Sequence, residues 1–278
     1  MDDHDRGLAH DLALIAQRRR MLLWLAGTGA ATLLGCGGGG DKADTSTTTT
    51  TDSSTTTTTT TTTTSCSVIP EETAGPYPGD GSNSNSSGVV DVLTLSGIVR
   101  SDIRSSIAGL SGTAAGVPLT VTITLVNTNN SCADLSGYAI YLWHCDRDGK
   151  YSLYTVTAQN YLRGVQETDS NGQVTFTTIF PACYSGRMPH IHFEVYRSLT
   201  TATSYSNKLK TSQIALPTDV CSTVYSSASG YSASVANLSQ ISFATDNIFS
   251  DGYSTQLATV TGDVTNGYAA TLTVGISV

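Results

Sequence analysis

Short segments in which apolar and polar side chains alternate run through residues 66–278, each bounded by Gly, Asn, Asp or Ser. Alternation with a period of two places one set of side chains on each face of a β-strand. Many such strands separated by turn residues are typical of an antiparallel β-sandwich or barrel, so we predict an all-β domain with long loops and little helix. The expected strands are residues 89–100, 118–128, 138–145, 172–180, 189–197 and 271–278.

Helical patterning is weak in the rest of this domain. Only residues 219–242 could hold a short helix. Residues 226–270 are rich in Ser, Gly, Asn and Thr, and we expect them to be mostly loop with short strands.

The first 35 residues have the features of an export signal. Three arginines at residues 18–20 precede an apolar run that is too short and too rich in Gly and Ala for a good membrane span. Arginines just before such a run suit a twin-arginine signal. The run ends in Leu-Leu-Gly-Cys, which is similar to a bacterial lipobox, so we expect Cys36 to become the lipidated N-terminus. An ordinary signal peptide with an unrelated cysteine is the alternative.

Residues 37–65 consist mostly of Gly, Thr and Ser. This composition cannot bury a core, so residues 36–65 are expected to form a lipid-anchored, disordered tether. The remaining chain, residues 66–278, is long enough for one domain with its own core. We therefore expect a protein exported by a bacterial cell and anchored to a membrane on its periplasmic or cell-surface face.

Charge and cysteine content limit the partners. The net charge is −8, and residues 1–35 contain four arginines and four aspartates, so the rest of the chain is equally acidic. An acidic chain without a basic cluster argues against nucleic acid as a partner. Five of the six cysteines fall in the domain, and in an exported protein some should pair. The pair we expect is Cys66 with Cys132.

The segment GRMPHIHFEV, residues 186–195, contains two of the three histidines of the domain. On a strand, His190 and His192 leave one face, whereas Ile191 and Phe193 leave the opposite, core-facing side. Two imidazoles can bind one metal but do not complete its shell. Zinc would need a further Cys, His or carboxylate, and Fe(II) would need a carboxylate, for which Glu194 is a candidate.

Two tyrosines are the other nearby candidates. Tyr184 precedes His190 by six residues, and Tyr151 follows the turn at residues 146–149. Two anionic phenolates with two neutral imidazoles would suit Fe(III). The alternative is that these tyrosines bind no metal and pack in the core. We expect His144 to lie behind the ligands or in the core.

Four segments in order resemble the intradiol ring-cleavage dioxygenases, and the exported branch of that family most closely. They are PEETAGPYPGDG (70–81), YLWHCDRDGKYS (141–152), YLRGVQETDSNGQVTFTTIFPACYSGR (161–187) and RMPHIHFEV (187–195). The likeness extends over most of residues 66–217 and little of the C-terminal sixty. It implies a β-sandwich of the intradiol dioxygenase type and a mononuclear, non-haem Fe(III) cofactor.

The resemblance also assigns residues. The family's Fe(III) ligands fall on Tyr151, Tyr184, His190 and His192. Tyr184 is the ligand that substrate displaces, so it also counts as catalytic.

Three further residues are assigned in the same way. The family's active-site arginine falls on Arg187 and its active-site glutamine on Gln213, both catalytic and beside the substrate. Its EGPY motif falls on residues 74–77, which brings Tyr77 toward the substrate. Ala74, Ala182 and Cys183 depart from the usual pattern of the family, and this affects substrate choice more than the metal.

The implied activity is cleavage of catechol-type diols with O₂. The ring opens between the two hydroxyl-bearing carbons, both oxygen atoms are incorporated, and muconate-type dicarboxylates form. The alternative is a non-catalytic exported β-sandwich that binds aromatic or sugar ligands, with a structural or vestigial metal site. The chain lacks the helical segment through which catechol 1,2-dioxygenases dimerise, and both a monomer and a homodimer stay open.

Overall fold

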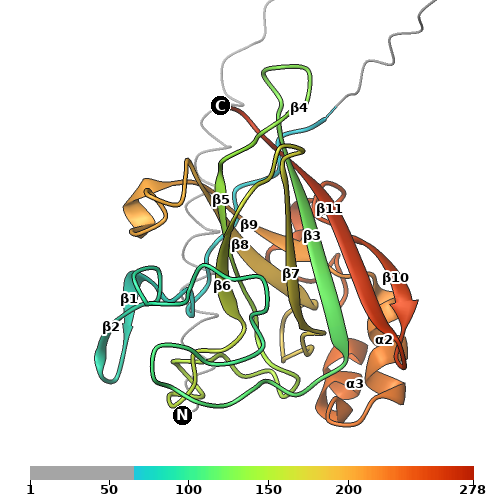
Figure 1. Cartoon of the computed structure of the whole chain (residues 1–278). Coiled ribbons are helices and arrows are strands. Elements are labelled where there is room, and N and C mark those ends of the chain that lie inside the picture. The colour runs from blue at the N-terminus through green and yellow to red at the C-terminus, as the bar shows by residue number, and fades with distance from the viewer. Residues whose placement is uncertain (1–65) are drawn as a thin grey trace, which may run out of the picture. The chain divides into compact units, whose positions relative to one another are not determined.

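The computed structural model describes residues 66–278, and their two larger β-sheets pack face to face (Figure 1), beside a third sheet of two strands. The predicted export signal, Cys36 and the predicted tether lie outside the described residues. The strands of the first sheet are, in order, β10 (Thr259–Asp263), β11 (Gly267–Ile276) and β3 (Pro118–Asn127), whose other edge pairs with β7 (Gln173–Ile179) and β4 (Ala133–Asp134). The order of the second sheet is β6 (Arg163–Glu167), β5 (Ala139–Trp143), β8 (His190–Tyr196) and β9 (Lys208–Ala215).

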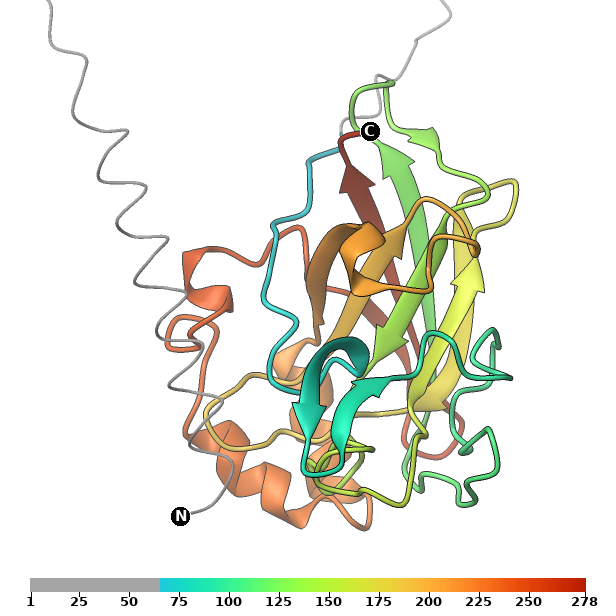
Figure 2. The ribbon, with the colours of Figure 1, turned by 90° about the vertical axis from the view of Figure 1, so that its left-hand side faces the viewer.

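The main core fills the space between the two sheets, which lie one behind the other in Figure 2. Alternate residues of β3, including Leu119, Val121 and Ile123, meet alternate residues of β8, including Ile191 and Phe193. Among the strand pairs of the described sheets, only β3 with β11 is parallel. The predicted all-β sandwich is therefore confirmed, with one parallel pair inside it.

The outer face of the second sheet is also covered, by loops rather than by another sheet. A second apolar cluster there includes Tyr141 and Trp143 of β5 together with Tyr151 and Tyr196. Every residue of β8 is consequently buried. Because side chains alternate, β8 gives Ile191 and Phe193 to the main core and turns both histidines toward the loop-covered face.

One expected strand was wrong over most of its length. Within residues 89–100, the start pairs as β2 (Gly88–Asp91) of a hairpin with β1 (Asp80–Asn85), and the end makes only an isolated bridge, between Val99 and Val165 of β6. Asp91 Oδ1 then accepts a hydrogen bond from the Leu93 amide at 2.9 Å, and the next residues form turns. Several apolar side chains of this stretch are still buried, including Val90, Val92, Leu93 and Ile98, whereas Val89 and Val99 are exposed. The apolar pattern therefore indicated partial burial and not strand pairing.

The region 219–242 holds two short helices, α2 (Thr218–Ser227) and α3 (Ser232–Ser239). Cys221, Val224 and Tyr225 form the buried stripe of α2 at helical spacing. Two 3₁₀ turns complete the elements, η1 (Tyr205–Asn207) and η2 (Phe249–Asp251). Within residues 66–278, no helix has the length and apolarity needed to span a membrane.

A disulfide joins Cys66 to Cys132, the pair expected from the sequence, with Cα atoms 5.8 Å apart. It connects the start of the described chain to the turn that follows β3. The other three cysteines of the described chain, Cys145, Cys183 and Cys221, are buried free thiols.

Candidate active site

The two histidines of β8 face each other across a short gap. Their Nε2 atoms are 3.1 Å apart, and both side chains are buried. The Trp143 ring stacks on His192 at a centroid distance of 4.9 Å and an interplanar angle of 5°. The Met188 carbonyl lies 2.6 Å from His190 Nδ1, which places the proton on Nδ1 and leaves Nε2 as an electron-pair donor.

Two loops bring the tyrosines to the same place. Tyr184 Oη lies 3.1 Å from His190 Nε2. The Tyr151 ring centroid is 6.0 Å from that of Tyr184 and 6.2 Å from that of His192. The structure therefore gathers Tyr151, Tyr184, His190 and His192, which are separated by up to 41 positions in the sequence.

The turn before Tyr151 is fixed by a carboxylate and a glycine. Asp146 Oδ1 accepts hydrogen bonds from the amides of Asp148 and Lys150, each at 2.9 Å. Gly149 has φ +77°, and a Cβ there would lie 3.1 Å from the Cβ of Tyr184. Glycine thus permits both the left-handed turn and the close approach of the two tyrosine loops.

The arrangement of the four donor side chains suits a shared metal ion better than direct hydrogen bonds among them. Two imidazole nitrogens bound at about 2.1 Å to one metal, at a right angle, lie about 3 Å apart, which is close to the observed separation. With the His190 proton on Nδ1, the electron pair of His190 Nε2 points at His192 Nε2. Either His192 Nε2 presents an electron pair as well, or it carries the only ring proton of His192 and leaves His192 Nδ1 without one. Tyr151 Oη and His192 Nδ1 are both buried without a hydrogen-bond partner in the described chain. A cation between the four side chains would resolve this arrangement.

Burial sets the protonation of the four groups. It lowers the pKa of His190 and His192 well below the usual value, so both imidazoles are neutral and suited to metal binding. It raises the pKa of Tyr184, and that of Tyr151 well above the usual value. Without a cation both phenols keep their protons at neutral pH, and only a strongly charged metal would release them.

Carboxylate and thiolate ligands do not replace the phenols. The described residues contain no group of three or more His, Cys, Asp or Glu side chains that could hold a metal ion. Glu194 is engaged elsewhere, because it accepts hydrogen bonds from Tyr196 Oη at 2.7 Å and Lys208 Nζ at 3.0 Å. A metal at this place would therefore depend on the tyrosines.

Arg187 lies beside the histidines, and its guanidinium is held from two sides. Its Nε donates to Asp246 Oδ2 at 3.0 Å and its Nη2 to Gln213 Oε1 at 2.6 Å. Gln213 itself is fully buried and donates through Nε2 to the Thr73 carbonyl at 3.0 Å. Gln213 lies behind Arg187, and its amide is occupied at both ends by protein groups.

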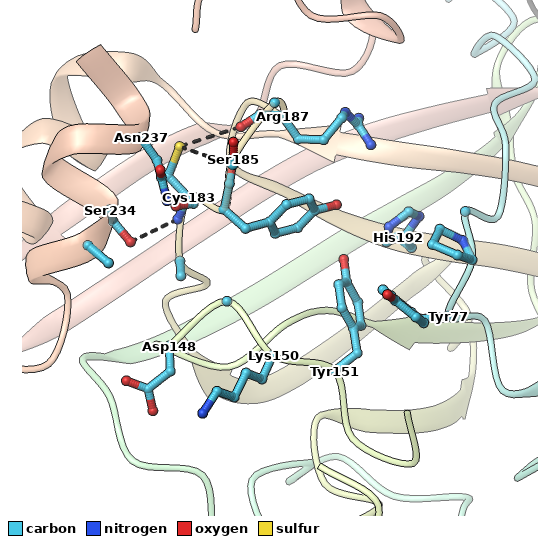
Figure 3. A pocket seen from close by; sticks show the side chains of 17 residues that line it. Tyr77, Asp148, Lys150, Tyr151, Cys183, Ser185, Arg187, His192, Ser234 and Asn237 are labelled. Carbon is cyan, nitrogen blue, oxygen red and sulfur yellow. Dashed lines mark hydrogen bonds between the residues drawn. The ribbon is translucent and has the colours of Figure 1, made fainter. Parts of the chain in front are cut away.

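A cavity of about 400 Å³ opens onto this group of side chains. Tyr77, Tyr151 and His192 lie at one end of it in Figure 3, and Ser234 and Asn237 of α3 lie at the other. The Tyr77 ring packs 5.1 Å from that of Tyr151. The remaining lining residues are Gly75, Pro76, Asp148, Gly149, Lys150, Ala182, Cys183, Tyr184, Ser185, Gly186, Arg187 and Ala233.

His144 is a core residue in this arrangement. Its Nδ1 lies 2.7 Å from the Cys145 carbonyl and its Nε2 2.7 Å from Thr178 Oγ1. Both ring nitrogens are occupied, and burial lowers the pKa of His144 to about 4. A neutral imidazole with two satisfied nitrogens has no site left for a metal.

The comparison with known proteins rests on structure alone, because no family model and no curated protein matches the chain. An intradiol ring-cleavage dioxygenase from Tetranychus urticae matches with a TM-score of 0.56 and 24% sequence identity, over 76% of this chain and 95% of that chain. The chain has the intradiol ring-cleavage dioxygenase fold.

A second match is the dioxygenase domain of a dioxygenase and carbohydrate-binding protein fusion from Streptomyces sp. SirexAA-E. It is 22% identical, with a TM-score of 0.47, over 76% of this chain and 99% of that chain.

Four residues around the candidate site of this intradiol-type fold were missed from the sequence. Arg163 and Asp246 are buried and charged, and Ser234 and Asn237 come from α3. Arg163 stands in a strand that the pattern did not predict, and the others lie in the stretch expected to be mostly loop. Their only sequence signal is an isolated polar residue, which does not distinguish a buried partner from a solvated one.

Proposed function

We propose that the domain is a non-haem Fe(III) intradiol dioxygenase that cleaves catechol-type diols with O₂. The observation that supports this most is the convergence of two neutral imidazole nitrogens and a phenol oxygen at 3.1 Å spacings, beside a second phenol whose buried hydroxyl has no partner in the described chain. Tyr151, Tyr184, His190 and His192 would hold the ion. Bound Fe(III) would make a catecholate reactive toward O₂, so that the ring opens to a muconate-type dicarboxylate containing both oxygen atoms.

The residues of the chain have separate tasks in this proposal. Tyr184 reaches the site from a loop at the cavity wall, and burial raises its pKa, so its phenolate oxygen is a good acceptor for a catechol proton. Tyr77 packs against Tyr151 and forms the wall against which an aromatic ring would lie. The Arg187 guanidinium would stabilise negative charge that develops on the substrate, at a buried position where a fixed cation is effective.

Gln213 acts through Arg187 in this scheme. Because its amide is occupied by Arg187 and Thr73, it holds the guanidinium and the 70–77 segment in place. Its effect on substrate is then one of positioning.

The test is the colour and oxygen uptake of the purified protein. Tyrosinate bound to Fe(III) should give a broad visible absorption band that shifts when catechol is added, and oxygen uptake should follow with some member of a catechol panel. Colourless protein that holds zinc or no metal after expression in iron-replete cells would reject the enzyme and favour a non-catalytic binding domain.

A pair of variants assigns the band to its ligand. Tyr184→Phe should remove part of the visible absorption, because one of two phenolate donors is lost. Tyr205→Phe is the matched control, since Tyr205 is an exposed tyrosine on η1. An unchanged band in Tyr184→Phe would remove this residue from the metal shell.

We also propose that the protein is exported by a bacterial cell and lipid-anchored through Cys36. The support is the sequence of residues 1–65 alone: arginines, an apolar run, Leu-Leu-Gly-Cys and a Gly/Thr/Ser tether. Labelled palmitate should enter the membrane-bound wild type and not Cys36→Ser. Equal labelling of the two proteins would contradict the anchor.

A further inference from the structure

A buried carboxylate from the C-terminal part of the chain lies directly behind Arg187. Asp246 is 0% exposed, and its Oδ2 accepts hydrogen bonds from Arg187 Nε at 3.0 Å and from the Met188 amide at 2.6 Å. It comes from the region that the sequence likeness hardly reaches. Asp246 is not one of the residues that line the cavity.

The carboxylate is itself rigidly held. Its other oxygen, Oδ1, accepts from the amides of Ile248 at 2.8 Å and Phe249 at 3.0 Å, at the start of η2. Four donors thus fix both oxygens. A charge-assisted hydrogen bond from such a fixed acceptor restricts the direction of the guanidinium strongly.

The remaining contacts of Arg187 leave one direction open. Gln213 occupies Nη2, and the Phe249 ring lies 5.8 Å from the guanidinium carbon. No hydrogen bond to the described residues involves Nη1, and Arg187 is one of the residues that line the cavity. Asp246, Gln213 and Phe249 together orient the planar fork so that its unoccupied nitrogen can serve a bound substrate.

Pairing also decides whether the guanidinium can stay in place. A buried cation without a partner carries a large desolvation cost, so an unpaired Arg187 would move toward water in the cavity. The pair with Asp246 offsets that cost while it leaves Nη1 free.

We infer that Asp246 is a positioning residue for the proposed dioxygenase, which holds Arg187 Nη1 toward the catecholic substrate. This inference rests on the proposed function of the same cavity. It gives Asp246 a supporting role at the active site, although Asp246 does not itself line the cavity.

The test is a double-mutant cycle of Asp246→Asn with Arg187→Met. Asparagine keeps one oxygen for the Ile248 and Phe249 amides, but its amino group can accept neither from Arg187 Nε nor from the Met188 amide. We expect kcat/KM and the anaerobic affinity for catechol, measured from the visible band, to fall about 10- to 100-fold in Asp246→Asn, as is typical when a supporting partner is lost. In the Arg187→Met background the same change should cost less than about threefold.

Iron content and the visible band of the substrate-free protein should stay at the wild-type level in every variant. A purely structural role of Asp246 would instead give losses that multiply in the double variant, and that result would overturn the inference. If Asp246→Asn does not fold, Arg187→Lys tests the same pair by changing the arginine instead of the aspartate. Lysine keeps the charge but cannot bridge Asp246 and Gln213, so it should be nearly as weak as Arg187→Met, and wild-type affinity would overturn the inference.

A last measurement separates this inference from the proposed function. In diamagnetic protein prepared without iron, the ¹⁵N NMR signal of Arg187 Nε–H should exchange slowly with solvent, and at least about tenfold faster in Asp246→Asn, because the exchange requires the hydrogen bond to open. If wild-type protein binds no iron and no catechol, the proposed function fails while this signal still tests the pair. Equal exchange in both proteins would overturn the positioning role.

Discussion

Replacement of Arg163 should destabilise the domain far more than replacement of an ordinary arginine. Arg163 is 0% exposed, and its guanidinium donates to the carbonyls of Tyr77 at 2.9 Å, Pro78 at 2.6 Å and Ser152 at 3.1 Å. It also bonds the hydroxyls of Ser152 and Tyr141, each at 3.0 Å. None of these partners is a carboxylate, so the cation is held by dipoles and by the Tyr154 ring, whose centroid lies 5.6 Å from the guanidinium carbon.

The magnitude follows from which acceptors lose their donor. In Arg163→Met the Pro78 carbonyl keeps the hydroxyl of Tyr141, which donates to it at 2.7 Å. The carbonyls of Tyr77 and Ser152 lose their guanidinium donor. A buried acceptor deprived of its donor costs about 1–3 kcal/mol, so two of them suggest a loss of about 2–6 kcal/mol in the free energy of unfolding. Methionine retains most of the apolar stem, and we expect a value near 4 kcal/mol.

The assay is urea-induced unfolding followed by far-UV circular dichroism, with Arg104→Met as the matched control. Arg104 pairs with Asp102 at the surface, with side chains 39% and 50% exposed, and should cost less than about 1 kcal/mol. Arg163→Lys should fall between the two, because an ammonium reaches fewer of the five acceptors. Equal losses for Arg163→Met and Arg104→Met would refute the reasoning.

Three further predictions concern the disulfide, a glycine and a histidine. Cys132→Ser opens a bridge with a sequence separation of 66 and should lower the unfolding free energy by about 4 kcal/mol on the chain-entropy estimate; a loss under about 1 kcal/mol would contradict this. If the proposed iron site is present, Gly149→Ala should shift its visible band because the new Cβ would press on Tyr184, whereas Gly186→Ala, at a similar φ of +83° with open space around it, should not; identical spectra would exclude the contact. The pKa of His144 is about 4 in the folded protein and near 6.5 in the unfolded chain, so the unfolded chain binds a proton first and stability should fall as pH drops from about 6.5 to 4. His144→Gln should reduce the slope of the unfolding free energy against pH by up to about 1.4 kcal/mol per pH unit, and equal slopes in the two proteins would argue against this.

The strands that form the main core could be predicted from the sequence because their apolar faces alternate. Residues 118–128, 138–145, 172–180 and 189–197 all contain strands that begin and end within a few residues of the expected bounds. β9 could not be found in this way. Its sequence KLKTSQIA is mostly polar, yet its last five residues are buried, because segment 71–73 and β8 satisfy their hydrogen bonds.

The candidate site also contains residues that the sequence pattern could place and residues that it could not. The strand register of His190 and His192 follows from Ile191 and Phe193, and the structure agrees with it. Tyr151 and Tyr184 were candidates from their position alone, but only the family resemblance favoured them as ligands, because nothing in a tyrosine's local sequence distinguishes a core ring from a ligand. The contact of Gly149 with Tyr184, which brings the two tyrosine loops together, depends on backbone positions that no sequence pattern reveals.

The polar residues that escaped prediction share a physical cause. The second sheet is covered on its outer face by loops, and loops bring backbone carbonyls and amides that must be satisfied when water is excluded. Arg163 supplies donors to the carbonyls of the 77–78 segment, and Asp246 supplies acceptors to the amides of residues 188, 248 and 249. Tyr77 and Arg187, which these two residues hold, line the cavity. A substitution that removes the hydrogen bonds of Arg163 or Asp246 should therefore disturb the cavity wall before it disturbs the sandwich core. In a series of milder variants at these two positions, affinity for the proposed substrate should be lost before the fold is lost.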